Sequence, residues 1–248
     1  MPRLDGRGER DLRAIEITAG VNVHAEGSVL IKMGQTQVIC TASVEDRVPP
    51  FMRDSGHGWI TGEYGMIPRA TGTRTPREAT RGRPSGRTHE IQRLIGRSLR
   101  AVADLTSLGP RTIWIDCDVI QADGGTRCAS ITGAFVAMSL AMAKLRGQGL
   151  LNAPPLRGMV SAVSVGMVGG NPCLDLNYVE DSQADVDMNV VRTDAGRYVE
   201  VQGTAEKSPF STEQMQKLLD LSTHGTNLLF EKQRQVLKDT LPQILPRP

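Results

Sequence analysis

The sequence has few aromatic residues, few cysteines and no long apolar run. Aromatic residues make up 4% of the 248 residues, which argues against a platform on which the bases of single-stranded nucleic acid stack. The four cysteines (Cys40, Cys117, Cys128 and Cys173) are widely spaced and form no CxxC pair, so neither a zinc site nor a disulfide framework is indicated. No unbroken apolar run approaches the roughly 18 residues of a membrane helix. The N-terminal stretch MPRLDGRGERDLR is charged and has no apolar core, so we expect a soluble, cytoplasmic protein.

Positive charge is concentrated in one segment of the chain. The formal net charge is only +2, yet residues 69–100 contain nine arginines, no lysine and two acids. Arginine makes forked contacts with phosphate oxygens, so this segment indicates a phosphate-rich partner. Alternatively, its first part could be a flexible solvated loop and its second part a salt-bridged helix face or a subunit contact. If the partner is RNA, the residues predicted to contact it are Arg69, Arg74, Arg77, Arg93 and Arg97.

Apolar periodicity predicts an α/β chain of the mixed α+β kind, with mixed sheets and helices packed on them. We expect strands at 28–33, 36–44, 112–120, 159–168, 173–180, 185–192 and near 197–202. Helices are expected at 89–105, 129–145 and from about 211 to 238, the last ended by Pro242. Residues 45–88 show few periodic apolar positions and are expected to form a long irregular connection. We expect one domain over 1–248, with subregions of about 1–150 and 156–248.

The loop Gln121-Ala122-Asp123-Gly124-Gly125-Thr126-Arg127 lies between a predicted strand and a predicted helix. Two glycines allow a tight turn that exposes backbone N–H groups, and a helix N-terminus carries a partial positive charge. A threonine hydroxyl and an arginine complete a small anion site. The same spacing is also typical of a plain strand-to-helix turn in which Thr126 caps the helix, and the pattern alone does not separate the two.

A run of acids follows in the second half of the chain, and residues 174–187 contain no lysine or arginine. Asp185 and Asp187 alternate with apolar residues, so on a strand they share one face. Two like charges on one face repel unless they bind a cation or one of them stays protonated. A Mg²⁺ site or a general acid would each suit phosphate chemistry. A solvated hairpin edge is the plainer interpretation, and the pattern alone favours it.

Two phosphate-holding elements, a carboxylate cluster and a basic loop together favour phosphoryl transfer on a polyanion. Several segments then resemble the bacterial ribonuclease PH family over essentially the whole chain. They are Gly58-Trp59-Ile60-Thr61, Glu63-Tyr64-Gly65-Met66, Gly86-Arg87-Thr88, the 121–127 loop, Val179-Glu180-Asp181-Ser182, Asp187-Met188-Asn189-Val190-Val191 and Val201-Gln202-Gly203-Thr204-Ala205-Glu206. Two positions depart from the family pattern: Cys128 stands where threonine is common, and Gly62 where alanine is common. Gly62 could loosen its loop.

The resemblance implies a phosphorolytic 3′-to-5′ exoribonuclease that trims tRNA precursors and releases nucleoside diphosphates. In reverse, such an enzyme adds nucleotides to RNA 3′ ends, and a role in rRNA processing is also implied. The family fold has an unusual left-handed βαβ crossover, and its members form a homo-hexamer, a trimer of dimers.

The resemblance also assigns residues. It implies that inorganic phosphate, the co-substrate, is bound by Arg87, Gly125, Thr126 and Arg127. Catalysis falls to Asp181 and Asp187, with Asp185 close by, and Mg²⁺ is expected at Asp181 and Asp187. Three rivals remain open: a non-catalytic ring subunit of an exosome-like assembly, a metal-dependent hydrolytic nuclease, and a structural protein that coats RNA.

Overall fold

The computed structural model describes Arg3 and residues 5–246, apart from the side chain of Arg81. Its first sheet contains five strands in the order β1-β2-β3-β5-β4. Their bounds are β1 (Ile15–Ala19), β2 (Gly27–Met33), β3 (Thr36–Glu45), β4 (Trp59–Met66) and β5 (Thr112–Gln121). Strands β4 and β5 are parallel, and the other neighbours are antiparallel. The helices α1 (Gly86–Arg100) and α2 (Leu105–Leu108) lie in the connection between the parallel pair, as parallel strands require.

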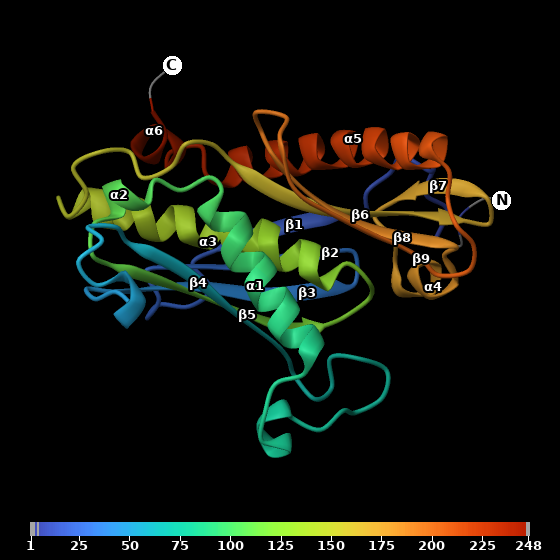
Figure 1. The fold of residues 1–248 in the computed structure, drawn as a ribbon, viewed down its shortest axis with the longest axis horizontal. Coiled ribbons are helices and arrows are strands. Elements are labelled where there is room, and N and C mark those ends of the chain that lie inside the picture. Colours follow the sequence, from blue (N-terminus) through green and yellow to red (C-terminus); the bar gives the residue numbers. More distant parts are fainter. Residues whose placement is uncertain (1–2, 4, 247–248) are drawn as a thin grey trace.

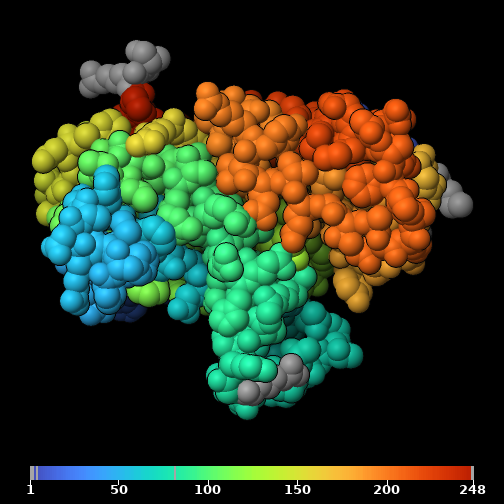
Figure 2. All heavy atoms as spheres, viewed as in Figure 1, coloured from blue at the N-terminus to red at the C-terminus, as the bar shows by residue number. Residues whose placement is uncertain are grey.

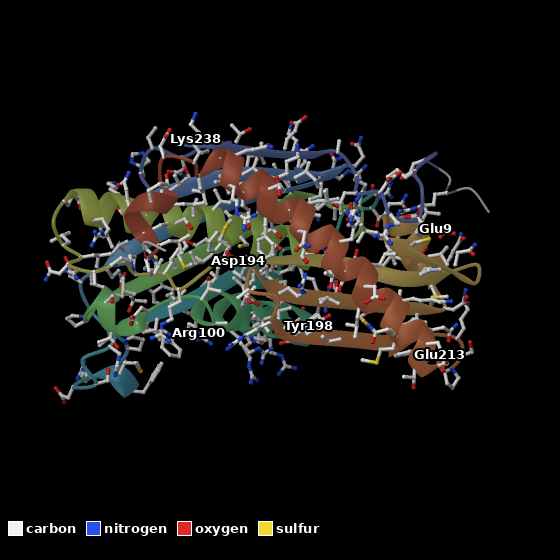
Figure 3. The ribbon with its side chains drawn as sticks, turned by 90° about the horizontal axis from the view of Figure 1, so that it is seen from above. Glu9, Arg100, Asp194, Tyr198, Glu213 and Lys238 are labelled. Carbon is white, nitrogen blue, oxygen red and sulfur yellow. The ribbon has the colours of Figure 1, made fainter. Side chains whose placement is uncertain are left out.

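The second sheet contains four antiparallel strands in the order β7-β6-β8-β9. They are β6 (Val160–Val168), β7 (Asn171–Leu174), β8 (Val186–Thr193) and β9 (Tyr198–Ala205). The short helix α4 (Tyr178–Gln183) connects β7 to β8, and α5 (Thr212–Val236) and α6 (Leu241–Ile244) end the chain. Figure 3 shows α5 lying across the second sheet, with Glu213 near its start and Lys238 just beyond its end.

The central helix α3 (Thr126–Gly147) lies between the two sheets (Figure 1). It packs on β2 and β3 of the first sheet and on β6 of the second, and it is buried on almost every side. By length and composition α3 could cross a membrane, but 83% of its most apolar window is buried inside the fold. The expectation of a well-buried apolar helix is confirmed, and the mixed α+β class with two sheets is confirmed as well.

The predicted hairpin near the N-terminus is present. Strands β2 and β3 pair with Met33 opposite Thr36, and Gly34 in the turn has φ +59°. A positive φ strains residues with a Cβ, which explains the glycine at this position. The helix predicted for residues 89–105 is also present as α1, although it begins earlier, at Gly86. Ser85 caps it, because its hydroxyl accepts a hydrogen bond from the Thr88 N–H.

The long connection predicted for 45–88 was wrong in part, because it contains strand β4. The inward-facing positions of this strand include Ile60, Gly62 and Tyr64, and the glycine interrupts the apolar alternation. A Cβ at Gly62 would lie 2.9 Å from Cγ2 of Ile95 on α1. Gly62 therefore lies in a strand packed against a helix, not in a loosened loop. Short 3₁₀ helices at Pro50–Met52 and Glu78–Arg81 occupy other parts of the connection.

The strand predicted for 173–180 was also wrong beyond Leu174. The chain turns at Asp175, whose φ is +52°, and then forms α4. Asn177 starts this helix with a capping box: its side chain accepts from the Glu180 N–H, and the Glu180 carboxylate accepts from the Asn177 N–H. Pro242 does not end the long C-terminal helix, which stops at Val236; it lies in the first turn of α6.

The segment between β4 and α1 projects away from the body of the molecule (Figure 2). Apart from Ala70, its residues from 69 to 77 are exposed. The Glu78 carboxylate anchors the far end of the segment to the start of α1, because it accepts a hydrogen bond from the Thr88 hydroxyl at 2.8 Å. The arginine-rich segment 69–77 therefore projects into solvent, and its far end is fixed to the start of α1.

Candidate active site

A cavity of about 550 Å³ opens where α1, α3, α4, β8 and β9 meet. Each of these elements contributes a polar side chain to its wall, among them Arg87, Arg127, Asp181, Asp187 and Gln202. A deeper recess of about 50 Å³ adjoins it, and Gly125 and Thr126 line this recess together with both arginines and both aspartates. The fold thus brings together the predicted phosphate-binding residues and two of the three predicted catalytic aspartates.

The loop before α3 has the backbone shape of an anion site. Gly124 and Gly125 have φ values of +73° and +67°, a conformation that glycine adopts at little cost. Gly125 takes the N-cap position of α3, where no side chain accepts from the first N–H groups. Those N–H groups and the positive end of the helix dipole are therefore available to an anion.

Thr126 is not the cap of α3 but its first residue, and its hydroxyl has a fixed partner. The buried Tyr64 hydroxyl lies 2.9 Å from Thr126 Oγ1. Burial raises the pKa of Tyr64, so the phenol stays neutral and can donate. If Tyr64 donates to Thr126, the proton of Thr126 is free to donate into the recess.

Arg127 is held from two sides. Its guanidinium donates to the Gln202 side-chain oxygen on β9 and lies 3.2 Å from the Glu90 carboxylate on α1. Gln202 in turn donates to the same Glu90 oxygen at 2.9 Å. Arg87 lies one turn before Glu90 and is exposed at the start of α1, where it lines both hollows. Two guanidinium groups therefore face the same small volume.

Asp187 is a half-buried acid of the cavity. Burial first, and the neighbouring Asp181 carboxylate second, raise the pKa of Asp187 to about 6. Asn189 donates to its Oδ2 at 3.4 Å, while its buried Oδ1 has no hydrogen-bond partner among the described residues. Burial also raises the pKa of Asp181, against the opposing effect of Arg87 and Arg127. A carboxyl group that holds its proton near pH 6 is suited to general acid catalysis.

The donor set also fits a divalent cation. The unpartnered Asp187 oxygen and the neighbouring Asp181 carboxylate are hard oxygen ligands of the kind that Mg²⁺ binds. Among the described residues, no group of three or more His, Cys, Asp or Glu side chains could hold a metal unaided. A cation here would need further ligands, and the oxygens of a substrate phosphate are the usual ones.

Asp185 lies apart from this cavity. Its side chain lines a neighbouring hollow with Arg3 and Cys173, and its carboxylate lies 3.5 Å from the Lys207 ammonium. It precedes β8, which begins at Val186. Asp185 therefore does not line the cavity, and the acid beside Asp187 there is Asp181 from α4.

The predicted RNA-binding arginines fall into two groups. Arg69, Arg74 and Arg77 are exposed on the projecting segment, and Arg69 donates to the Gly72 carbonyl at 2.6 Å. Arg93 and Arg97 lie on α1 and line a separate hollow of about 310 Å³ beside Trp59. Arg97 forms an ion pair with Glu200 on β9.

Sequence reasoning missed the residues that hold Thr126, Arg127 and Asp187 in place. Tyr64, Gln202 and Asn189 belong to segments that carried the family resemblance, but their residue types alone gave no sign of a role. Their partners Thr126, Arg127 and Asp187 are 62, 75 and two residues away in sequence. Only the resemblance of their segments could have directed attention to them.

Comparison with known proteins assigns the chain to a family. Two family models match it: domain 1 of the 3′ exoribonuclease family over residues 11–144, and domain 2 of the same family over residues 158–225. Ribonuclease PH of Bacillus pumilus is 60% identical over 240 residues, covering 96% of this chain and 99% of that protein. Ribonuclease PH of Solibacter usitatus is 59% identical over 236 residues, covering 95% and 99%.

Solved structures share the fold. An exosome chain from Archaeoglobus fulgidus, solved with RNA bound to the active site, has a TM-score of 0.77 and 25% identity, covering 93% of this chain and 92% of that chain. Rice Rrp46 has the same fold, with a TM-score of 0.77 at 18% identity, covering 95% and 100%. The chain belongs to the 3′ exoribonuclease family, within its ribonuclease PH branch.

Proposed function

We propose that the cavity between Arg127 and Asp187 is the phosphorolysis site of this enzyme. As a ribonuclease PH, the chain is a phosphate-dependent 3′-to-5′ exoribonuclease that acts in tRNA processing. The observation that carries the site assignment is the convergence of two arginines, a glycine loop and two carboxylates on one polar cavity.

Inorganic phosphate would bind at the glycine loop. The N–H groups at the start of α3 and the hydroxyl of Thr126 donate to its oxygens, and Arg87 and Arg127 offset its charge. This offset matters because the attacking phosphate and the RNA phosphodiester are both anions. Holding them in contact requires fixed cations in a site from which most water is excluded.

Proton transfer would fall to Asp187. A phosphate oxygen attacks the phosphorus of the terminal phosphodiester and forms a new P–O bond, while the bond to the 3′ oxygen of the penultimate ribose breaks. That oxygen must gain a proton, and a carboxyl group with a pKa near 6 can supply it. The products are a nucleoside diphosphate and an RNA shortened by one nucleotide. The reverse direction uses the same groups and would add nucleotides from nucleoside diphosphates.

Mg²⁺ is the cation that we infer for the two carboxylates. Asp181 and the ionised form of Asp187 would hold it, and when bound it would neutralise charge on the reacting phosphates. The protonated form of Asp187 is the one that supplies the proton. Asp185 is left out of this set, because its carboxylate faces Lys207 in the neighbouring hollow. We therefore narrow the catalytic assignment to Asp181 and Asp187.

RNA would enter past the arginine segment. The exposed Arg69, Arg74 and Arg77, and Arg93 on α1, offer sequence-independent phosphate contacts. The relative solved with RNA bound to its active site supports RNA as the substrate. We infer that tRNA precursors are the main substrates and that rRNA processing is a further role.

We further infer that the chain works as one domain, in the cytoplasm, as a homo-hexamer built as a trimer of dimers. The relative from Archaeoglobus fulgidus is an exosome chain, which supports assembly into an oligomer. Sedimentation velocity on the purified protein measures the assembly, and a monomer at micromolar concentration would contradict it.

One incubation separates the proposed function from its rivals. The pure protein is mixed with a tRNA precursor labelled at its 3′ end, with and without inorganic phosphate, and the released nucleotide is identified. Phosphorolysis requires release of nucleoside diphosphates that depends on phosphate. Release of monophosphates without phosphate would make the protein a hydrolase, and binding without any turnover would make it a non-catalytic RNA-binding subunit.

A further inference from the structure

A buried arginine from the N-terminal segment lies directly beneath the phosphate-binding loop. Arg13 is 6% exposed, although it precedes the first strand and the residues around it are largely exposed. A Cβ on Gly125 would lie 3.0 Å from Nη2 of Arg13. The guanidinium thus forms part of the floor of the loop, on a segment that none of the catalytic assignments uses.

Arg13 is fixed by a buried carboxylate from the second sheet. Its Nε lies 3.0 Å from Oδ2 of Asp175 and its Nη2 lies 2.7 Å from Oδ1. The Arg13 backbone N–H also donates to Oδ2, at 2.8 Å. Asp175 is fully buried and has φ +52°, a conformation that a residue with a Cβ adopts only where its surroundings enforce it. The pair is forked, so it fixes both the position and the rotation of the guanidinium.

The remaining guanidinium N–H groups hold the loop by its carbonyl oxygens. Nη1 of Arg13 donates to the Asp123 carbonyl, and Nη2 lies 3.4 Å from the Gly124 carbonyl. Thr36 holds one of these carbonyls and the start of the loop: its hydroxyl donates to the Gly124 carbonyl at 2.7 Å and accepts from the Asp123 N–H at 2.9 Å. Donors from β3 and from the N-terminal segment therefore hold both carbonyl oxygens on the protein side of the loop.

Because the peptide bond is planar, holding these carbonyl oxygens also fixes the direction of the loop N–H groups. In a planar trans peptide the carbonyl and the following N–H point in opposite directions. Holding the Asp123 and Gly124 carbonyls inward therefore turns the N–H groups of Gly124 and Gly125 outward. Neither N–H has a hydrogen-bond acceptor among the described residues, and Gly125 lines the recess beside Arg127. The N–H of Gly125, which lines the recess, is thus oriented before any anion arrives, and this lowers the cost of binding the anion.

We propose that Arg13 and Thr36 are positioning residues for phosphate: they hold the carbonyl oxygens of Asp123 and Gly124 so that the loop N–H groups point at the bound anion. The inference rests on the proposed function, in that the loop must bind inorganic phosphate. Asp175 neutralises the Arg13 charge, so the contribution is one of orientation more than of charge.

The test measures phosphorolysis as a function of phosphate concentration for a matched set of variants. Thr36→Val removes the hydroxyl while keeping the branched shape, and Thr36→Ser restores the hydroxyl. Arg13→Lys keeps the charge but loses the fork. Arg192→Lys is the control, because Arg192 is a buried arginine that donates to the Thr226 hydroxyl at 2.9 Å, away from the loop.

We expect Thr36→Val and Arg13→Lys to raise the KM for phosphate about 10-fold, because a misdirected hydrogen bond to an anion is worth about that factor. Their kcat at saturating phosphate and their KM for RNA should stay close to wild type. Thr36→Ser should restore the phosphate KM, and Arg192→Lys should leave it unchanged. In parallel, the rise in melting temperature on adding inorganic phosphate should shrink in Thr36→Val and Arg13→Lys only.

Two outcomes would overturn the inference. One is a folded Thr36→Val protein with the wild-type KM for phosphate. The other is a set in which Arg13→Lys and Arg192→Lys lose stability and activity alike while the phosphate KM stays fixed, which would make Arg13 a merely structural residue. If Arg13→Lys does not fold, the comparison of Thr36→Val with Thr36→Ser tests the inference alone. Wild-type turnover that needs no phosphate would instead contradict the proposed function itself.

Discussion

Replacing the proposed general acid should stabilise the protein while disabling it. Asp187 is half-buried beside Asp181, and these surroundings raise its pKa from 3.8 to about 6. At neutral pH the folded protein must therefore keep an ionised carboxylate where ionisation is unfavourable. Asp187→Asn replaces that carboxylate with a neutral amide of the same shape, so the penalty disappears.

The size and the pH window follow from the two pKa values. Because the folded-state pKa lies above the unfolded-state value, the contribution of Asp187 to stability is complete below about pH 4 and is lost as the pH rises through about 6. A displacement of this size corresponds to about 3 kcal/mol at most, and to about 2 kcal/mol once the partial access of water is allowed for. Asparagine does not ionise, so the stability of Asp187→Asn lacks this dependence on pH.

Urea unfolding of wild type and Asp187→Asn, in EDTA and at a series of pH values, measures the difference. The stability advantage of the variant should grow by about 2 kcal/mol between pH 4 and pH 8. The control is Asp239→Asn, which replaces an exposed carboxylate outside the cavity by the same amide. A pH-independent difference for Asp187→Asn, or one that shrinks as the pH rises, would show that the folded protein does not raise the pKa of Asp187.

Three further predictions concern RNA binding, the cation and the packing of β4. Replacing Arg74 and Arg77 with alanine should reduce the slope of log affinity for RNA against log salt concentration by about 1.4, which is about 0.7 for each lost phosphate contact. Arg47→Ala is the control. An unchanged slope would mean that the projecting segment does not contact RNA. Removing divalent cations with EDTA should lower kcat at saturating phosphate, and Mg²⁺ should restore it; equal rates in both would exclude a cation from the two carboxylates. Gly62→Ala should cost about 1 kcal/mol of stability, because its Cβ would contact Cγ2 of Ile95. Urea unfolding should show that Ile95→Leu, which removes the Cγ2 branch, recovers part of this loss. A neutral Gly62→Ala would mean that α1 moves aside freely.

Local patterns in the sequence predicted the elements that have strong periodicity. The β2–β3 hairpin and the buried helix α3 both appear where the apolar spacing indicated them. Strand β4 was not predicted because Gly62 occupies an inward position. The alternation of apolar and polar residues that indicates a strand is therefore broken there. Helix α4 was misassigned although its capping box was readable, with Asn177 followed three residues later by Glu180.

The candidate site was predictable only in part. Arg127 and Asp187 lie in recognisable segments, but their meeting depends on how the two sheets pack around α3. The pairing of Asp187 with Asp181 across α4 and β8, in place of Asp185, follows from a turn at Asp175 that no periodicity indicates. Contacts such as that of Arg13 with Asp175 join residues 162 positions apart, and local sequence carries no sign of them.

The most direct test of the account is the division of labour within the cavity. Phosphate titrations at saturating RNA give kcat and the phosphate KM for wild type, Arg127→Ala and Asp187→Asn. We predict that Arg127→Ala raises the phosphate KM by about 10-fold or more, as loss of a charged hydrogen bond to an anion does. Asp187→Asn should lower kcat by about 100-fold or more with RNA binding intact, as loss of a general acid does. Wild-type turnover in Asp187→Asn, or an unchanged phosphate dependence in Arg127→Ala, would contradict the account.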